Sequence, residues 1–97
     1  MPANIRLNVD LSTGHNCWPP TLPVTASMNV FCNGRAEVRV GDKYMTHLCG
    51  YVIKPHQGTA LVGAAKTFTN GRNTMVQGGQ IDCGDRAANG SPNVFSG

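Results

Sequence analysis

The sequence predicts a small all-β domain made of short hairpins that repeat along the chain. Glycine interrupts nearly every stretch, so no window keeps apolar residues at helical spacing. Runs such as Ile5–Val9 and Ala36–Val40 instead have apolar residues at every second position, which is typical of strands. Asn-Gly pairs at 33–34 and 70–71 suit two-residue hairpin turns, because both central positions of such a turn take a positive φ.

The chain also repeats itself. Segment 27–35 recurs as segment 64–72, at a shift of 37 residues, and a third copy occupies segment 90–95. Repeats this short cannot each bury an apolar face alone, so the copies are expected to pack on one another. Three imperfect copies predict pseudo-threefold packing around one axis.

Length and composition indicate that this fold needs a stabilising cross-link, such as disulfides or a bound metal ion. The 97 residues form one domain, 1–97, with a thin core, twelve glycines and six prolines. No apolar run approaches the roughly 18 residues of a transmembrane helix, and Met1–Asp10 lacks the apolar region of a signal peptide. Without an export signal, four cysteines favour a metal site over a disulfide framework. The net charge of +3 is too small and too scattered to predict nucleic-acid binding.

Matched positions in the repeat predict the metal ligands. His15 and His47 each lie five residues after an Asp that ends a strand. Cys83 lies four residues after Gly79, the repeat equivalent of one of these Asp residues. His56, in a Pro-His-Gln-Gly loop, supplies a fourth ligand. Three imidazoles and one thiolate suit one tetrahedral Zn²⁺, and a site closed by four protein ligands is structural because no position is left for water.

Other interpretations of these residues stay open at this point. Each histidine, taken singly, also fits an ordinary surface residue. Cys17 and Cys49 are rival ligands, each two residues from a predicted histidine ligand, whereas Cys32 lies within a repeat strand and is expected to be a packing residue. Trp18, followed by two prolines, fits either a loop packed on its own domain, which we favour, or an anchor for a partner.

Several motifs resemble the PAAR-repeat proteins. Their signature places Pro-Ala-Ala-Arg between Asn-Gly-Arg and Val-Gly-Asp. Segment 33–42 keeps both flanks and the Arg, but its core has Ala-Glu-Val in place of Pro-Ala-Ala. Shorter matches follow the family order: a first histidine loop at 14–15, a cysteine turn at 82–84 and a Gly-Ser-Pro strand opener at 90–92. The resemblance covers nearly the whole chain.

This resemblance implies a cone-shaped PAAR-type fold with one structural zinc near its apex, held by three histidines and a cysteine. The family sits by its wide base on a trimeric β-helical spike, one monomer per trimer, in contractile phage tails and type VI secretion systems. It implies a non-enzymatic tip that sharpens the spike and touches the target membrane transiently. The corresponding location is the virion, in the tail baseplate, after assembly in the host cytoplasm. Expected contributors to the base are Ile5, Leu7, Val24 and Val62.

The alternatives are a secretion-system tip that carries effectors and an unrelated small zinc-stapled binding module. A zinc hydrolase is disfavoured, because the chain has no His-Glu-x-x-His motif and Glu37 is its only glutamate. A zinc-stapled nucleic-acid binder would need clustered basic or stacking aromatic residues. A cystine-rich secreted module would show paired rather than free thiols.

Overall fold

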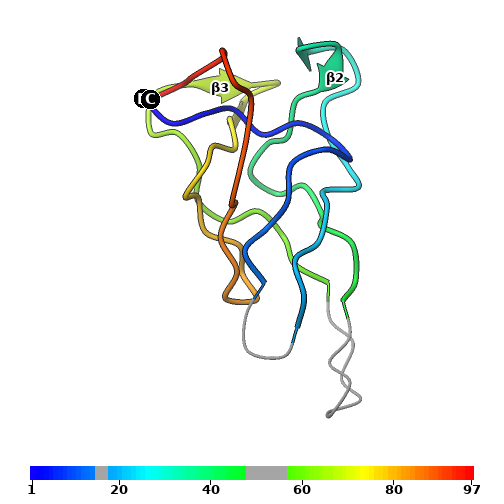
Figure 1. The fold of residues 1–97 in the computed structure, drawn as a ribbon. Helices are drawn as coiled ribbons and strands as arrows, with labels where there is room; N and C mark the ends of the chain where they lie inside the picture. The colour runs from blue at the N-terminus through cyan, green and yellow to red at the C-terminus, as the bar shows by residue number, and fades with distance from the viewer. Residues whose placement is uncertain (15–17, 48–56) are drawn as a thin grey trace.

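Short antiparallel hairpins are the only regular elements in the part of the chain that the structure describes. The computed structural model describes residues 1–14, 18–47 and 57–97. In these ranges β1 (Phe31–Cys32) pairs with β2 (Arg35–Ala36), and β3 (Phe68–Thr69) pairs with β4 (Arg72–Asn73) (Figure 1). Isolated bridges join the remaining segments. The all-β prediction is confirmed for these ranges, and none of their segments forms a helix able to cross a membrane.

The two hairpins are copies of each other. Asn33 and Gly34 have φ of 53° and 77°, and Asn70 and Gly71 have φ of 54° and 78°. These positive values identify both Asn-Gly pairs as the predicted tight turns. The pairing register also repeats at the 37-residue shift, since Phe31 lies opposite Ala36 as Phe68 lies opposite Asn73.

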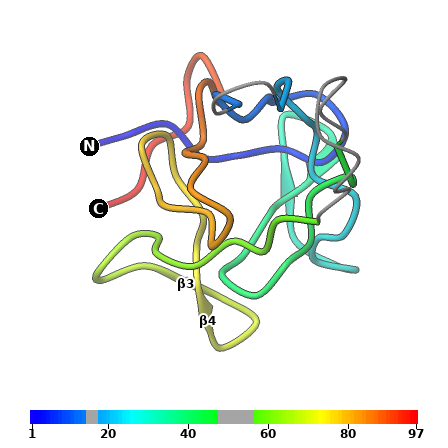
Figure 2. The same cartoon turned by 90° about the horizontal axis from the view of Figure 1, so that it is seen from below.

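A third hairpin-like unit joins the two ends of the described chain. Ala3 forms a bridge with Phe95, and the Asn4 amide donates to the Val94 carbonyl at 2.9 Å. The Ser91 amide in turn donates to the Asn4 carbonyl at 2.8 Å. Both ends of the chain therefore lie together (Figure 2). The N-terminal segment occupies the place that β2 and β4 occupy in the other two copies.

The three copies contact one another through equivalent residues. The Ile5 amide donates to Met75 O at 3.1 Å, the Met75 amide to Val38 O at 2.9 Å, and the Val38 amide to Ile5 O at 3.0 Å. These bonds close a ring, and all three side chains are 0% exposed. Tyr44, Ala60, Ile81 and Ala87 extend the same core. The ring thus forms one end of a small apolar core that all three copies share.

Two of the three copies end in an Arg–Asp clamp. Arg6 binds Asp10 through its backbone amide and guanidinium, at 2.8–2.9 Å, and Arg39 binds Asp42 in the same way, at 2.7–3.0 Å. In the third copy the equivalent positions hold Val76 and Gly79, so both partners are missing together. Because the two clamps lie at equivalent positions, they establish which residues of the copies correspond to one another beyond the ring. His47 lies five residues after Asp42 of the second clamp.

Two expectations about the N-terminal strand are wrong. The predicted strand Ile5–Val9 ends its pairing at Arg6, and Leu7–Val9 form a turn in which Asn8 has φ of 59°. The cause is one extra residue between Arg6 and Asp10 compared with the second clamp, and the chain must absorb it before Asp10 folds back. Ile5 also cannot belong to an exposed base, because it is fully buried in the ring.

Candidate metal centre

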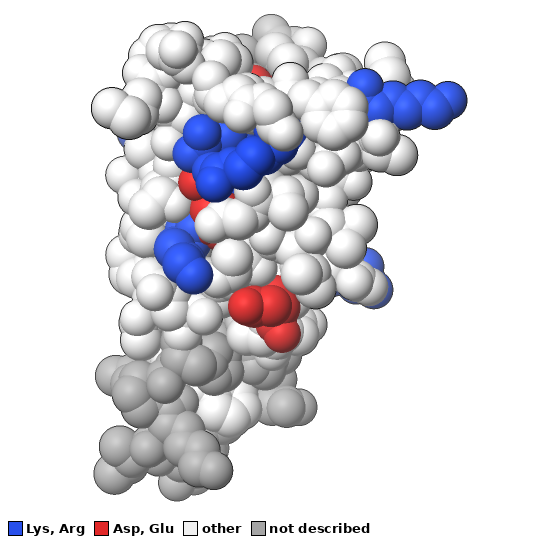
Figure 3. Space-filling view, turned by 180° about the vertical axis from the view of Figure 1, so that it is seen from behind, with Lys and Arg blue, Asp and Glu red and all other residues white. Residues whose placement is uncertain are grey.

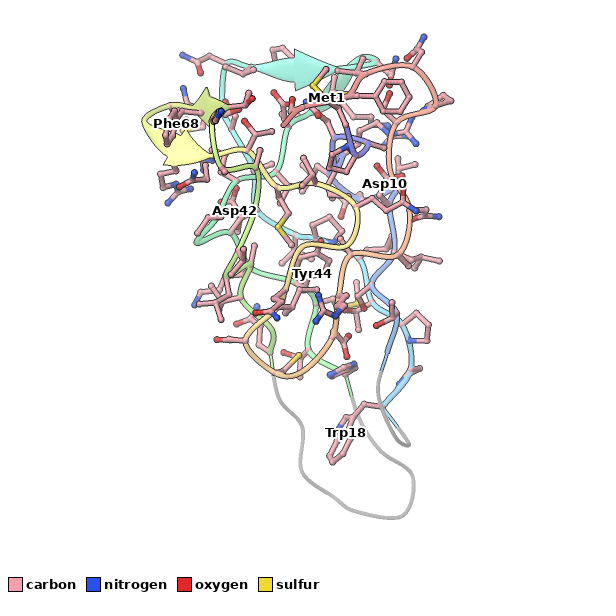
Figure 4. All side chains as sticks on the ribbon, turned by 90° about the vertical axis from the view of Figure 1, so that its left-hand side faces the viewer. Met1, Asp10, Trp18, Asp42, Tyr44 and Phe68 are labelled. Atoms are coloured by element: carbon pink, nitrogen blue, oxygen red, sulfur yellow. The ribbon has the colours of Figure 1, made fainter. Side chains whose placement is uncertain are left out.

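Three side chains with metal-binding atoms meet at the end of the molecule away from the hairpins. One ligand atom each from His47, Cys83 and Asp85 lies within 4.8 Å of the other two. His47 and Asp85 are 4% and 2% exposed, and Cys83 is half-buried. Trp18, whose ring centroid lies 6.5 Å from that of His47, marks this end, and the labelled Phe68 and Met1 mark the other (Figure 4).

His47 is oriented by contacts with Trp18 and Pro19, which lie in a distant segment of the chain. Its Nδ1 lies 2.8 Å from the carbonyl oxygen of Pro19. A carbonyl only accepts, so Nδ1 carries the hydrogen, and Nε2 is the nitrogen of this tautomer whose lone pair can bind a metal. This is the arrangement in which metal-binding histidines are commonly held. The ring contact with Trp18 also confirms that this tryptophan packs on its own domain.

Cys83 and Asp85 come from one tight turn. The Ile81 amide donates to the Asp85 carbonyl at 2.9 Å, and the Gly84 amide donates to the Ile81 carbonyl at 3.1 Å. Gly84 has φ of 104°, a conformation that side-chain-bearing residues rarely adopt. The turn therefore needs glycine at this position, and it presents the residues on either side of it to His47.

Asp85 is held from across the fold. Its Oδ2 accepts a hydrogen bond of 2.8 Å from the Ser12 hydroxyl. Ser12 Oγ in turn accepts from the Thr21 amide at 2.9 Å, so the hydroxyl proton is directed to the carboxylate. This chain of contacts holds the carboxylate at the cluster, in the way that outer partners orient metal ligands.

The thiol of Cys83 is poised to exchange its proton for a metal. Burial raises the pKa of Cys83 above its ordinary value, and the negative charges of Asp85 and Asp82 add to this, against a backbone hydrogen bond from Asp85 that lowers it. Without a metal, the group is therefore a protonated thiol at neutral pH. A divalent cation would displace that proton, so metal binding here releases protons and weakens as the pH falls.

The cluster contains two of the four predicted ligands. His47 and Cys83 come together, whereas His15 and His56 lie outside the described residues, as do the rival ligands Cys17 and Cys49. Cys32 is 3% exposed in β1, in agreement with the packing role expected of it. Asp85 was not predicted. The available signal was the run Asp-Cys-Gly-Asp at 82–85, in which a second potential ligand follows the cysteine across a glycine.

No family model matches the chain, and no curated protein matches it.

The donor atoms of the site indicate which metal ion suits it. An imidazole nitrogen, a sulfur and a carboxylate oxygen form a mixed set of the kind that zinc binds. Any two ligand atoms of a tetrahedral zinc lie roughly 3.3–3.8 Å apart, by the usual bond lengths. Donor atoms within 4.8 Å of one another thus need only a small inward movement to hold an ion.

Proposed function

We propose that the protein is the tip of a contractile-injection spike, a single chain that caps the end of a trimeric β-helical protein. The observation that carries the proposal is the closed ring of hydrogen bonds among Ile5, Val38 and Met75. It gives one polypeptide three equivalent sectors. A trimer ends in three equivalent strand edges, and exposed edges invite unwanted pairing. A monomer with three matched sectors can cover all three edges at once.

The end that carries the hairpins has the character of a docking face. Phe31, Phe68 and Phe95 occupy the same position in the three copies and are 63%, 60% and 48% exposed. Met1 and Met28 are more exposed still, at 86% and 94%. Solitary exposed apolar residues are ordinary, but a set of large ones repeated by the fold marks an interaction surface. We propose these five residues, called the base ring below, as the centre of the base; of the contributors expected from the sequence, Ile5 is buried, whereas Val24 and Val62 are exposed.

The charged residues near the hairpin end indicate which groups the partner carries around its contact surface. On the face shown in Figure 3, Lys and Arg gather toward the hairpin end, and the clearest Asp/Glu patch lies nearer the other end. Arg35 and Lys66 are both exposed on the described surface. The partner of this end is therefore an apolar surface with acidic groups around it. Association should be faster at low salt, because such charges mainly steer the encounter.

The opposite end is proposed to hold one structural zinc. His47 and Cys83 are two of its ligands in this proposal. Asp85 either binds the zinc as a further ligand or, where the predicted His15 and His56 are the other two ligands, orients the ligands from beside the ion. A bound zinc would cross-link the loops at this end, where few apolar side chains can pack. A full set of four protein ligands leaves no coordination position for a catalytic water. The protein is accordingly proposed to be structural rather than enzymatic. Its proposed location is the tail baseplate of a virion, as the PAAR-repeat resemblance implies, with a secretion-system spike as the alternative.

Binding stoichiometry tests the proposal. The zinc-loaded chain is mixed with a trimeric β-helical spike protein from the same source, and the mass of the complex is measured by light scattering after size exclusion. One chain per trimer is expected. Phe68→Asp, in the base ring, should abolish the complex, whereas Leu61→Asp, at an exposed apolar residue outside the base ring, should leave it intact. Three chains per trimer, or equal effects of the two variants, would contradict the proposal.

A further inference from the structure

A buried polar layer lies between the base ring and the ring of apolar residues. It contains Asn4, Glu37 and Thr74, which directly precede Ile5, Val38 and Met75 at equivalent positions of the three copies; they are 4%, 7% and 0% exposed. Polar side chains this deep are normally hydrogen-bonded throughout. This layer is not.

One acceptor atom of the layer receives no hydrogen bond. Asn4 Nδ2 donates to Glu37 Oε1, and Thr69 Oγ1 donates to Glu37 Oε2 at 3.4 Å. The hydroxyls of Thr69 and Thr74 lie 2.7 Å apart. Asn4 Oδ1 is fully buried and has no hydrogen-bond partner. It belongs to the same amide whose nitrogen donates to the Glu37 carboxylate, so the unsatisfied oxygen lies close to that carboxylate.

The charge of Glu37 is likewise unbalanced within the described residues. Arg6 pairs with Glu37 along the backbone, but its guanidinium binds Asp10 at 2.9 Å. The other ion pairs of the described chain join Arg39 and Arg72 to Asp42. A carboxylate buried without a positive partner is costly, because neither water nor a cation offsets its charge.

Turning the Asn4 amide over does not remove the problem. The amide nitrogen and oxygen would exchange places, an assignment made from the hydrogen-bond network. Oδ1 would then face the Glu37 oxygen, bringing two acceptors together. A proton between the two oxygens or a cation bound beside them would relieve this contact, and only a cation makes the stability of the fold depend on sodium.

We propose that Asn4 and Glu37 bind a monovalent alkali cation, with sodium as the natural ligand, and that Thr69 Oγ1 contributes to its coordination. The donors are all oxygens, which suit a hard cation and not the zinc proposed for the opposite end. One carboxylate among neutral oxygens balances a single positive charge. The site is independent of the spike-tip function, because it uses no residue of the base ring and none of the metal centre.

Thermal unfolding of the zinc-loaded chain tests this proposal. The wild type is compared in sodium chloride and in choline chloride at equal ionic strength, since choline is too large for the site. At sodium ten times its dissociation constant, a Tm increase of about 6–11 °C over choline is expected for a domain of this size. Glu37→Gln should abolish this increment. Asp82→Asn, which removes the same charge from an exposed side chain, should keep it.

A second measurement covers the case in which Glu37→Gln does not fold. Crystals of the wild type grown with thallium(I) in place of sodium should give an anomalous peak between Asn4 Oδ1 and the Glu37 carboxylate. Thr69→Val should then weaken the sodium dependence of Tm. The proposal is overturned if no peak is found, if Glu37→Gln retains the sodium increment, or if the wild type is equally stable in both salts.

Discussion

Asp42→Asn is the most informative single substitution for how the copies hold together. Asp42 is 3% exposed, and its two oxygens accept five hydrogen bonds. Three come from Arg39, at 2.7–3.0 Å, one from Arg72 at 3.0 Å and one from the Thr25 hydroxyl at 3.1 Å. Arg72 belongs to β4, in the next copy of the repeat, so the carboxylate joins two copies.

The loss of stability can be bounded from the exposure of these partners. Removing one member of a buried ion pair costs about 3–5 kcal/mol, because the other charge is left unpaired. The Arg39 side chain is 16% exposed and so bears most of this cost, whereas the Arg72 side chain is 43% exposed and can turn to water. We therefore expect Asp42→Asn to lower the free energy of unfolding by about 2–4 kcal/mol, less than the full range for a buried pair.

Urea denaturation of the zinc-loaded chain measures this loss. Asp82→Asn serves as the control for charge removal, because Asp82 is exposed, and should change the free energy of unfolding by less than about 0.5 kcal/mol. Asp10→Asn removes the other clamp, which binds one arginine rather than two. If Asp42→Asn costs no more than Asp82→Asn, the clamp does not stabilise the fold and the reasoning is refuted.

The same carboxylate predicts a dependence on pH. Burial alone would raise the pKa of Asp42, but hydrogen bonds from the Arg39 side chain and backbone and from Thr25 outweigh it, and the net pKa lies below the ordinary value. The folded state therefore holds this proton less tightly than the unfolded state. The stabilisation is complete above the unfolded pKa, about 4, and is lost as the pH falls through the folded pKa. Asp42→Asn should remove this part of the acid sensitivity.

Three further predictions concern the turns, the closure of the chain and the metal. Gly34→Ala and Gly71→Ala should each cost about 1–2 kcal/mol in urea denaturation, because an added Cβ meets no atom within 4 Å and only the positive φ is strained; unequal costs would argue against equivalent turns. A circular permutant that joins residue 97 directly to residue 1, carries Gly97→Asn and Met1→Gly, and opens at Gly34 should remain folded by circular dichroism, since residues 97 and 1 take the places of Asn33 and Gly34 and the third copy then gains the turn of the other two; an unfolded chain would count against the third copy. Cys83→Ser should lower Tm only in the presence of zinc, and an equal loss with a chelator present would assign Cys83 to packing instead.

The features predicted correctly are those that local sequence encodes. Asn-Gly at 33–34 and 70–71 determines a backbone conformation by itself, so the turns and the repeat could be found without a structure. The third copy was seen only in part, because its second arm is the N-terminal segment at the far end of the chain. Asp10 and Asp42 could be matched as strand ends, but the extra residue between Arg6 and Asp10 hid the equivalence of Arg6 with Arg39.

The candidate site was predicted in part, for a similar reason. His47 and Cys83 lie five and four residues after equivalent strand ends, so the repeat could place them. Asp85 looks like an ordinary turn residue, and its burial depends on Ser12, which is 73 residues away. Alternation also shows which residues share a face but not which end of the molecule they reach. For that reason Ile5 was assigned to the base although it lies in the core.

Diffraction from crystals of the zinc-loaded chain, recorded on both sides of the zinc absorption edge, tests the metal centre most directly. We expect one anomalous peak per chain, within bonding distance of His47 Nε2 and Cys83 Sγ and beside the Asp85 carboxylate. An electron density map in which His47 and Cys83 point apart, or a zinc bound at some other group of residues, would contradict it.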